Sequence, residues 1–521
     1  MRHTSITVIA LAFAAVAAAG CADDFLTTTP PDQLSDAVYW QSEKDAVLAV
    51  NAIYPYLWDD NLLHLEAASD NGYQNKQWLR AYSYGTGTHD AFTDWGRDRW
   101  QESYEAVRRA NNVLANIDRV EAIDGTLKER LKGEAAFLRA YNYVYLVNLY
   151  GSVPLILTPL TVSESKTVTR AGVGEVVDQI IADLDFAAGV LPVSYGGAAL
   201  GRATRGAALA LKARAALYAG RYDVAAAAAK AVMDLGVYSL HPDYAALFTY
   251  AGEGSPEIIL ARQQIKNQYA TGVFAAMAPY SSQGGSDVVP TRSLVDAYLM
   301  TDGLPAGQSP RYDPATPFAN RDPRLAATVL FPGAEWDDGV YDSTPTSTTA
   351  DRVGSDFLAT ATGYNLRKYI DLADKSDRSN GGIDYIQLRY ADVLLMYAEA
   401  RIEQGQIDAS VYDAINAVRA RVDMPAVEPG RSQAELREIV RHERQVELGM
   451  EGLRLFDIRR WRIAESVFNG PVRGIDYVDT DGSTKTIVPD QRRFVAPRDY
   501  LWAIPQRERD LNPGLEQNPG Y

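Results

Sequence analysis

Apolar side chains that recur every three or four residues are the feature that most constrains how this chain folds. This spacing marks one face of an α-helix, because about 3.6 residues complete each turn. Six stretches show it, at residues 100–117, 131–149, 208–218, 222–232, 388–402 and 411–422. Gly151 and Pro154 follow the second stretch and are typical of a helix end. The sequence therefore predicts a mainly α fold.

Short glycine turns join two pairs of these helices. Gly220 separates the stretches at 208–218 and 222–232, and Gly405 separates those at 388–402 and 411–422. Small side chains such as those of Ala225 and Ala229 let two antiparallel helices approach closely. The pattern matches the helix–turn–helix unit of tetratricopeptide repeats. We therefore expect a tetratricopeptide-like helical repeat scaffold.

Two long stretches lack sustained helical periodicity. Residues 69–99 and 238–384 are rich in Gly, Pro, Ser, Thr and Asp, with aromatic residues scattered among them. Long irregular regions within a folded protein are usually functional. Because no linker clearly divides the chain, we expect a single domain over residues 33–521 with large irregular loop regions.

The N-terminus has the features of an export signal. Residues 1–20 contain a basic start, an apolar run and small residues at the end, directly before Cys21. Cys21 is the only cysteine in the chain and stands where a bacterial lipoprotein carries its lipidated residue. We expect a lipoprotein signal peptide over 1–20, lipidation of Cys21, and an extended tether over residues 21–32.

Charge and composition exclude several classes of function. The formal charge is −16, from 51 Lys and Arg against 67 Asp and Glu. Nucleic acids and anionic membrane surfaces need a basic footprint, so neither is expected as the main partner. The chain has only five histidines, and it lacks a P-loop, a G-x-S-x-G elbow and an H-E-x-x-H helix. We expect no metal site and no cofactor.

A segment resembling part of a calcium loop has a simpler interpretation. Residues 479–482 read Asp-Thr-Asp-Gly, but the spacing of an EF-hand loop is not met around them. An Asp-Gly turn between two short strands is the better prediction.

The densest cluster of charged residues lies at residues 435–465. It holds seven acidic residues and seven arginines in apparently helical sequence. Glu443 and Glu447 are one helical turn apart, so a carboxylate pair of the glycosidase type has to be considered. The balance of charges favours an internal network of ion pairs, and catalysis by this pair is the weaker hypothesis.

Aromatic and polar residues concentrate in the irregular stretch at 69–99. An aromatic ring can stack on the C–H face of a sugar while amides, carboxylates and guanidinium groups bind its hydroxyls. The sequence therefore predicts a sugar-binding surface in this stretch. Its candidate residues are Asn71, Tyr73, Trp78, Arg80 and Trp95.

Short motifs recur in a specific order along the chain. They are AFLRAY at 136–141, LYGSVPL at 149–155, RYAD at 389–392, YAEA at 397–400, EGLR at 451–454, DIRRW at 457–461 and QNPGY at 517–521. Each motif alone is weak evidence. As an ordered set they resemble the SusD/RagB family of outer-membrane, nutrient-binding lipoproteins.

The resemblance implies a fold, a location and a partner. The fold would be the SusD-like α-α superhelix, and the protein would be a lipid-anchored outer-membrane protein at the cell surface. It would capture an oligosaccharide without catalysis and deliver it to a SusC-like TonB-dependent transporter. The ligand surface of such proteins comes from the stretch before the Trp100 helix and from middle loops, which adds Tyr280 and Trp336 to the candidates.

Two alternatives remain open at this point. A RagB-like member of the same family would bind peptides, through main-chain pairing and side-chain pockets rather than aromatic stacking. A glycoside hydrolase would use Glu443 and Glu447 as its catalytic carboxylates.

Overall fold

A computed structural model of the protein describes residues 39–521. The expected signal peptide, Cys21 and the tether at 21–32 lie outside the described residues. Within residues 39–521, no helix is long and apolar enough to cross a membrane.

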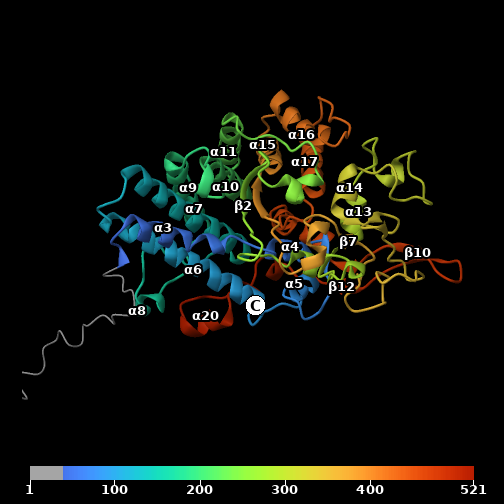
Figure 1. Ribbon diagram of the computed structural model, residues 1–521, viewed down its shortest axis with the longest axis horizontal. Coiled ribbons are helices and arrows are strands. Elements are labelled where there is room, and N and C mark those ends of the chain that lie inside the picture. Colours follow the sequence, from blue (N-terminus) through green and yellow to red (C-terminus); the bar gives the residue numbers. More distant parts are fainter. Residues whose placement is uncertain (1–38) are drawn as a thin grey trace, which may run out of the picture.

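Antiparallel helices packed one against the next form the scaffold (Figure 1). In chain order, α6 contacts α7, α7 contacts α9, α9 contacts α10, α10 contacts α11, and α11 contacts α15, which also packs against α16 and α17. The mainly α, tetratricopeptide-like prediction is confirmed. These helices are α6 (Asp94–Asn116), α7 (Gly125–Tyr150), α9 (Val173–Val190), α10 (Arg205–Tyr218), α11 (Tyr222–Asp234), α15 (Tyr390–Glu403), α16 (Ala409–Ala420) and α17 (Gln433–Glu447).

Glycine and alanine explain how the helix pairs turn and pack. Gly220 and Gly405 both adopt positive φ angles, 72° and 69°, which residues other than glycine rarely adopt. Ala225 and Ala229 on α11 are fully buried against α10, so their small side chains allow the close approach that the sequence predicted. Helix α7 lies at the centre, with its second half buried on nearly all sides.

The remaining helices are short and belong mostly to the irregular regions. Figure 1 shows α13 and α14 at one end of the molecule and α20 below α6. They are α3 (Glu43–Asn51), α4 (Asn61–Ala67), α5 (Tyr82–Thr86), α8 (Val162–Ser165), α12 (Val273–Met277), α13 (Arg292–Ala297), α14 (Pro323–Thr328), α18 (Arg454–Arg460), α19 (Ala464–Val467) and α20 (Gln506–Leu511).

Strands occur in the described residues only as antiparallel pairs. Two pairs are local hairpins, and the other four join segments that lie apart in the sequence. The pairs are β1 (Gly72–Gln74) with β3 (Val288–Pro290), β2 (Ile258–Arg262) with β8 (Tyr385–Arg389), β4 (Val329–Leu330) with β7 (Asn365–Leu366), β5 (Glu335–Trp336) with β6 (Gly339–Val340), β9 (Gly470–Val472) with β12 (Asp490–Arg492), and β10 (Asp476–Val478) with β11 (Thr484–Thr486). The last pair encloses the predicted Asp-Gly turn, with Gly482 at φ 82°.

A buried network of ion pairs joins the helical scaffold to the irregular regions. Arg389 at the end of β8 donates to Glu447 at 2.6 Å, to Glu451 at 2.7 Å and to Glu257 at 2.9 Å. Burial alone would raise the pKa of Glu447, but Arg421, Arg389 and Arg324 hold it well below its ordinary value. The Glu447 carboxylate therefore stays ionised inside the protein at neutral pH.

The charge cluster at residues 435–465 is thus structural, as its balance of charges predicted. Arg324 bonds both Glu443, at 2.6 Å, and Glu447, at 3.0 Å. Both glutamate side chains are completely buried. Neither carboxylate is open to a substrate in this conformation, which removes the geometric basis of the hydrolase alternative.

We predict that Glu447→Gln lowers the free energy of unfolding by about 3–5 kcal/mol, because Arg324, Arg389 and Arg421 each lose one of the buried carboxylates that they share. Urea unfolding of the protein without residues 1–21 measures this. Arg431→Gln is the matched control, because its ion pair with Glu435 is exposed and exposed ion pairs contribute little to stability. Equal unfolding midpoints for the two variants would contradict the structural role of Glu447.

Candidate functional site

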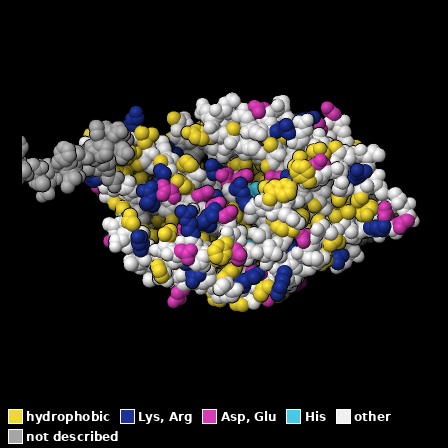
Figure 2. Space-filling model, turned by 90° about the horizontal axis from the view of Figure 1, so that it is seen from below, with side chains coloured by type: hydrophobic (Ala, Val, Ile, Leu, Met, Phe, Trp, Pro, Cys, Tyr) yellow, Lys and Arg dark blue, Asp and Glu magenta, His cyan; other side chains and the backbone are white. Residues whose placement is uncertain are grey.

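A groove of about 480 Å³ lies where the loop before α5 meets the first two turns of α6. We call it the aromatic groove. Its walls include Trp78, Arg80, Trp95, Asp98, Arg99 and Glu102. Figure 2 looks onto the lower side of the molecule as drawn in Figure 1, the side that carries α20, and shows acidic and basic side chains intermingled there with hydrophobic ones. The groove therefore combines aromatic surface with hydrogen-bonding groups.

An exposed pair of aromatic rings stands at the groove. Trp78 is 70% exposed, and Phe357, from a loop far away in the sequence, is 65% exposed. Their ring centroids are 6.0 Å apart and the rings are inclined by 54°. A sugar between them would need two contacts of about 3.5–4.0 Å, so it does not fit there. Instead, the two rings offer their outer faces.

A third exposed ring lies near the groove in sequence. Phe92 is 74% exposed and directly precedes Thr93 and Asp94, which line the groove. Soluble proteins seldom leave several large aromatic side chains exposed in one region unless they bind something there.

Trp95 forms the inner wall and is only 3% exposed. Its indole Nε1 donates to Asn61 Oδ1 at 3.0 Å, and Arg80 Nη1 donates to the same oxygen at 2.8 Å. The Trp95 ring also packs against Tyr84 and Trp502, with centroids 5.5 and 5.0 Å away. Asn61 thus fixes the positions of Trp95 and Arg80 together.

Ion pairs organise the charged wall along α6. Arg97 contacts Asp94 at 2.6 Å and Asp98 at 2.8 Å, and Arg99 pairs with Glu102. Burial raises the pKa of Glu102, Arg99 opposes this, and the nearby Asp59 and Asp98 carboxylates raise it further. The wall therefore offers several carboxylate oxygens at one place.

The structure separates the seven candidate residues into three groups by their exposure. Trp78 and Arg80 are exposed at the groove and Tyr280 is half-buried, whereas Trp95, Tyr73, Asn71 and Trp336 are buried. The buried four satisfy their polar groups internally. Tyr73 donates to Asp490, Trp336 donates to Ser282, and the Asn71 amide bonds Glu66 and Gln445. Direct stacking of a ligand on these four does not fit this conformation.

Sequence reasoning missed Phe357 and Phe92. Both lie in irregular sequence without a helical stripe, and such aromatic residues usually pack beneath their own loops. The sequence marks these two residues only as apolar rings among small and polar residues. Many buried loop residues have the same surroundings in sequence, so this pattern does not indicate exposure. Only the fold brings Phe357 beside Trp78.

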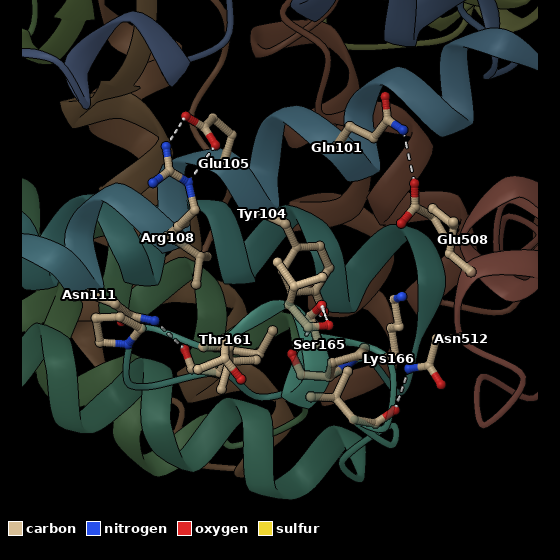
Figure 3. Close-up of a pocket in the computed structure, with 18 of the residues that line it drawn as sticks. Gln101, Tyr104, Glu105, Arg108, Asn111, Thr161, Ser165, Lys166, Glu508 and Asn512 are labelled. Carbon is tan, nitrogen blue, oxygen red and sulfur yellow. Dashed lines mark hydrogen bonds and ion pairs between the residues drawn. The ribbon is translucent and has the colours of Figure 1, made fainter. Parts of the chain in front are cut away.

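A second and larger groove, of about 620 Å³, lies between α6, α8 and α20 (Figure 3). Its polar groups mostly bond the protein itself. Tyr104 donates to the Pro154 carbonyl at 2.8 Å, Gln101 to Glu508 at 2.9 Å and Asn512 to the Val168 carbonyl at 2.7 Å. The walls of this groove are mostly apolar, so it resembles a sugar-binding surface less than the aromatic groove does.

Within residues 39–521, no group of three or more His, Cys, Asp or Glu side chains is arranged to hold a metal ion.

Comparison with known families identifies the chain. Residues 256–521, half of its length, match the sequence model of the SusD family. The chain belongs to the SusD family. Residues 24–217 match a related model described as starch-binding and associating with the outer membrane.

Individual SusD-like proteins match over nearly the whole chain. A SusD-like carbohydrate-binding protein from Bacteroides fragilis is 31% identical, with a TM-score of 0.86 over 92% of this chain and 100% of that one. SusD-like protein P2 of Formosa agariphila is 28% identical over the full length of both chains. Surface glycan-binding protein A from Bacteroides fluxus shares the fold, with 22% identity and a TM-score of 0.71 over 92% of this chain and 100% of that one.

We predict that Trp95→Ala destabilises the fold by about 3–5 kcal/mol, because it empties a buried aromatic cluster and leaves Asn61 short of a donor. Trp78→Ala is the matched control, and as a surface substitution it should change stability by about 0.5 kcal/mol or less. Urea unfolding compares the two. Equal losses of stability would show that the two tryptophans do not differ in burial as described.

Proposed function

We propose that this protein is a cell-surface lipoprotein that binds oligosaccharides without cleaving them and delivers them to a SusC-like TonB-dependent transporter. The observation that carries the binding claim is the exposed pair of Trp78 and Phe357 beside the polar aromatic groove. Family membership and the carbohydrate-binding relative from Bacteroides fragilis support the same ligand class.

The chemistry of the groove suits a sugar. A pyranose presents a face of C–H bonds, which stacks on an aromatic ring, and a rim of hydroxyls, which needs donors and acceptors. Trp78 and Phe357 supply rings, and Asp98, Glu102 and the exposed guanidinium group of Arg80 supply hydrogen bonds. Each contact is worth about 1 kcal/mol, so we expect a dissociation constant on the order of 10 μM to 1 mM.

Other observations support the proposed attachment and delivery. Cys21 is placed as the lipidated residue of a bacterial lipoprotein, and the matched family model describes association with the outer membrane. A lipid on Cys21 would hold the protein at the membrane, where a SusC-like transporter could receive the sugar. A polymer that engages several such proteins would bind far more tightly than one site does.

We predict that Trp78→Ala and Phe357→Ala each weaken binding of a neutral oligosaccharide about fivefold to tenfold, which corresponds to about 1–1.4 kcal/mol. Isothermal titration calorimetry of the protein without residues 1–21, against ligands first found in a screen of polysaccharides and peptides, measures the change. Phe186→Ala is the matched control, because Phe186 is a partly exposed ring on α9, away from the groove.

Two results would contradict the proposal. If the double variant of Trp78 and Phe357 binds as tightly as the unaltered protein, the site lies elsewhere. If only peptides bind in the screen, the ligand class is wrong. Chromatography of the sugar after prolonged incubation tests the non-catalytic claim, and the release of shorter products would refute it.

A further inference from the structure

We propose that the aromatic groove selects neutral oligosaccharides and rejects chains that carry carboxylate or sulfate groups. This inference rests on the proposed glycan-binding function and specifies the class of glycan. It is carried by the arrangement of charged side chains around the groove.

The arginines of the α6 wall are already neutralised by the protein. Arg97 holds Asp94 and Asp98, and Arg99 is committed to Glu102. The Arg99 guanidinium carbon also lies 5.3 Å above the Trp58 ring, which keeps it against the interior. An anionic sugar would therefore have to displace carboxylates that belong to the same helix and already pair with these arginines.

Arg80 is the exposed guanidinium group opposite that wall. One of its nitrogens is bound to Asn61 at 2.8 Å, and Asn61 in turn bonds Asp59. The Asp60 carboxylate interacts electrostatically with Arg80. The positive charge of Arg80 is thus partly balanced before any ligand arrives, while its remaining N–H groups can still donate to hydroxyls.

Three carboxylates and two guanidinium groups line the groove itself: Asp94, Asp98 and Glu102 against Arg80 and Arg99. Arg262 adds a further cation nearby through its 3.1 Å contact with Asp59. Together with the neighbouring charges Asp59, Asp60, Arg97 and Arg262, which pair or interact with these groups or with one another, carboxylates outnumber guanidinium groups by five to four. Like charges at such distances repel, and less so as salt increases.

Two further sources of positive potential are also cancelled. The N-terminus of α6 opens at the groove, and its dipole would favour an anion, but Asp94 occupies the first turn. Lys76, the lysine nearest to Trp78 in sequence, is buried and pairs with Asp287 and the Gly285 carbonyl. The attraction that remains is uncharged: the faces of Trp78 and Phe357, and hydrogen bonds to hydroxyls.

The experiment compares matched ligands that differ in charge. Laminarin, pullulan and galactan are each tested beside the same chain with its primary hydroxyls oxidised to carboxylates. For every neutral chain that binds, we expect at least tenfold weaker binding of the oxidised form in 20 mM NaCl. The gap should narrow in 500 mM NaCl, because screening weakens repulsion but does not restore a lost hydroxyl.

A pair of variants ties the selectivity to the groove. Asp98→Asn removes one carboxylate from the groove, and Arg97 still pairs with Asp94. In 20 mM NaCl, the ratio of the affinity for the neutral chain to that for the oxidised chain should fall about threefold. Asp118→Asn is the control. This exposed carboxylate lies beyond the other end of α6, about 24 Å along the helix from Glu102, and should leave the ratio unchanged.

The outcomes separate this inference from the proposed function. If the oxidised chains bind as tightly as the neutral ones at low salt, or if the gap does not respond to salt, the charge-selection inference is overturned while glycan binding stands. If none of the neutral or oxidised chains binds, and the wider screen finds no polysaccharide ligand, the proposed function itself fails.

Discussion

The buried guanidinium group of Arg389 is the interaction on which the rest of the structure depends. It ends strand β8 and binds Glu257, Glu447 and Glu451, so one side chain links the β2–β8 pair to α17 and to the turn that follows it. Without its carboxylates this charge would be very costly to bury. The long irregular regions consequently have a fixed attachment to the helical scaffold, and loops distant in sequence meet in a defined arrangement.

The same logic extends to the aromatic groove. The C-terminal part of the chain returns to the scaffold, where the Trp502 amide donates to the Leu149 carbonyl and the Trp502 ring packs on Trp95. Asn61 then aligns Trp95 with Arg80. The buried, hydrogen-bonded inner wall lies beside the exposed ring of Trp78, so little ordering would be needed if a ligand binds at the proposed site.

The sequence predicted the scaffold well and the site only in part. Helical stripes with glycine turns at Gly220 and Gly405 have one strong physical solution, and α10–α11 and α15–α16 adopt it. The balance of charges at 435–465 similarly indicated an internal network. Whether an aromatic ring in a loop is buried or exposed depends on contacts distant in sequence. The ring of Trp95 packs on Trp502, and the ring of Trp78 lies beside Phe357. No local sequence pattern predicts either contact.

We propose the rings of Trp78 and Phe357 as the surface on which a sugar stacks. A crystal structure of the protein with a neutral oligosaccharide from the screen tests this proposal most directly. We expect a pyranose with its C–H face against Trp78 or Phe357 and its hydroxyls directed to the carboxylates of the α6 wall. A saccharide bound elsewhere on the molecule, with both rings still open to solvent, would contradict it.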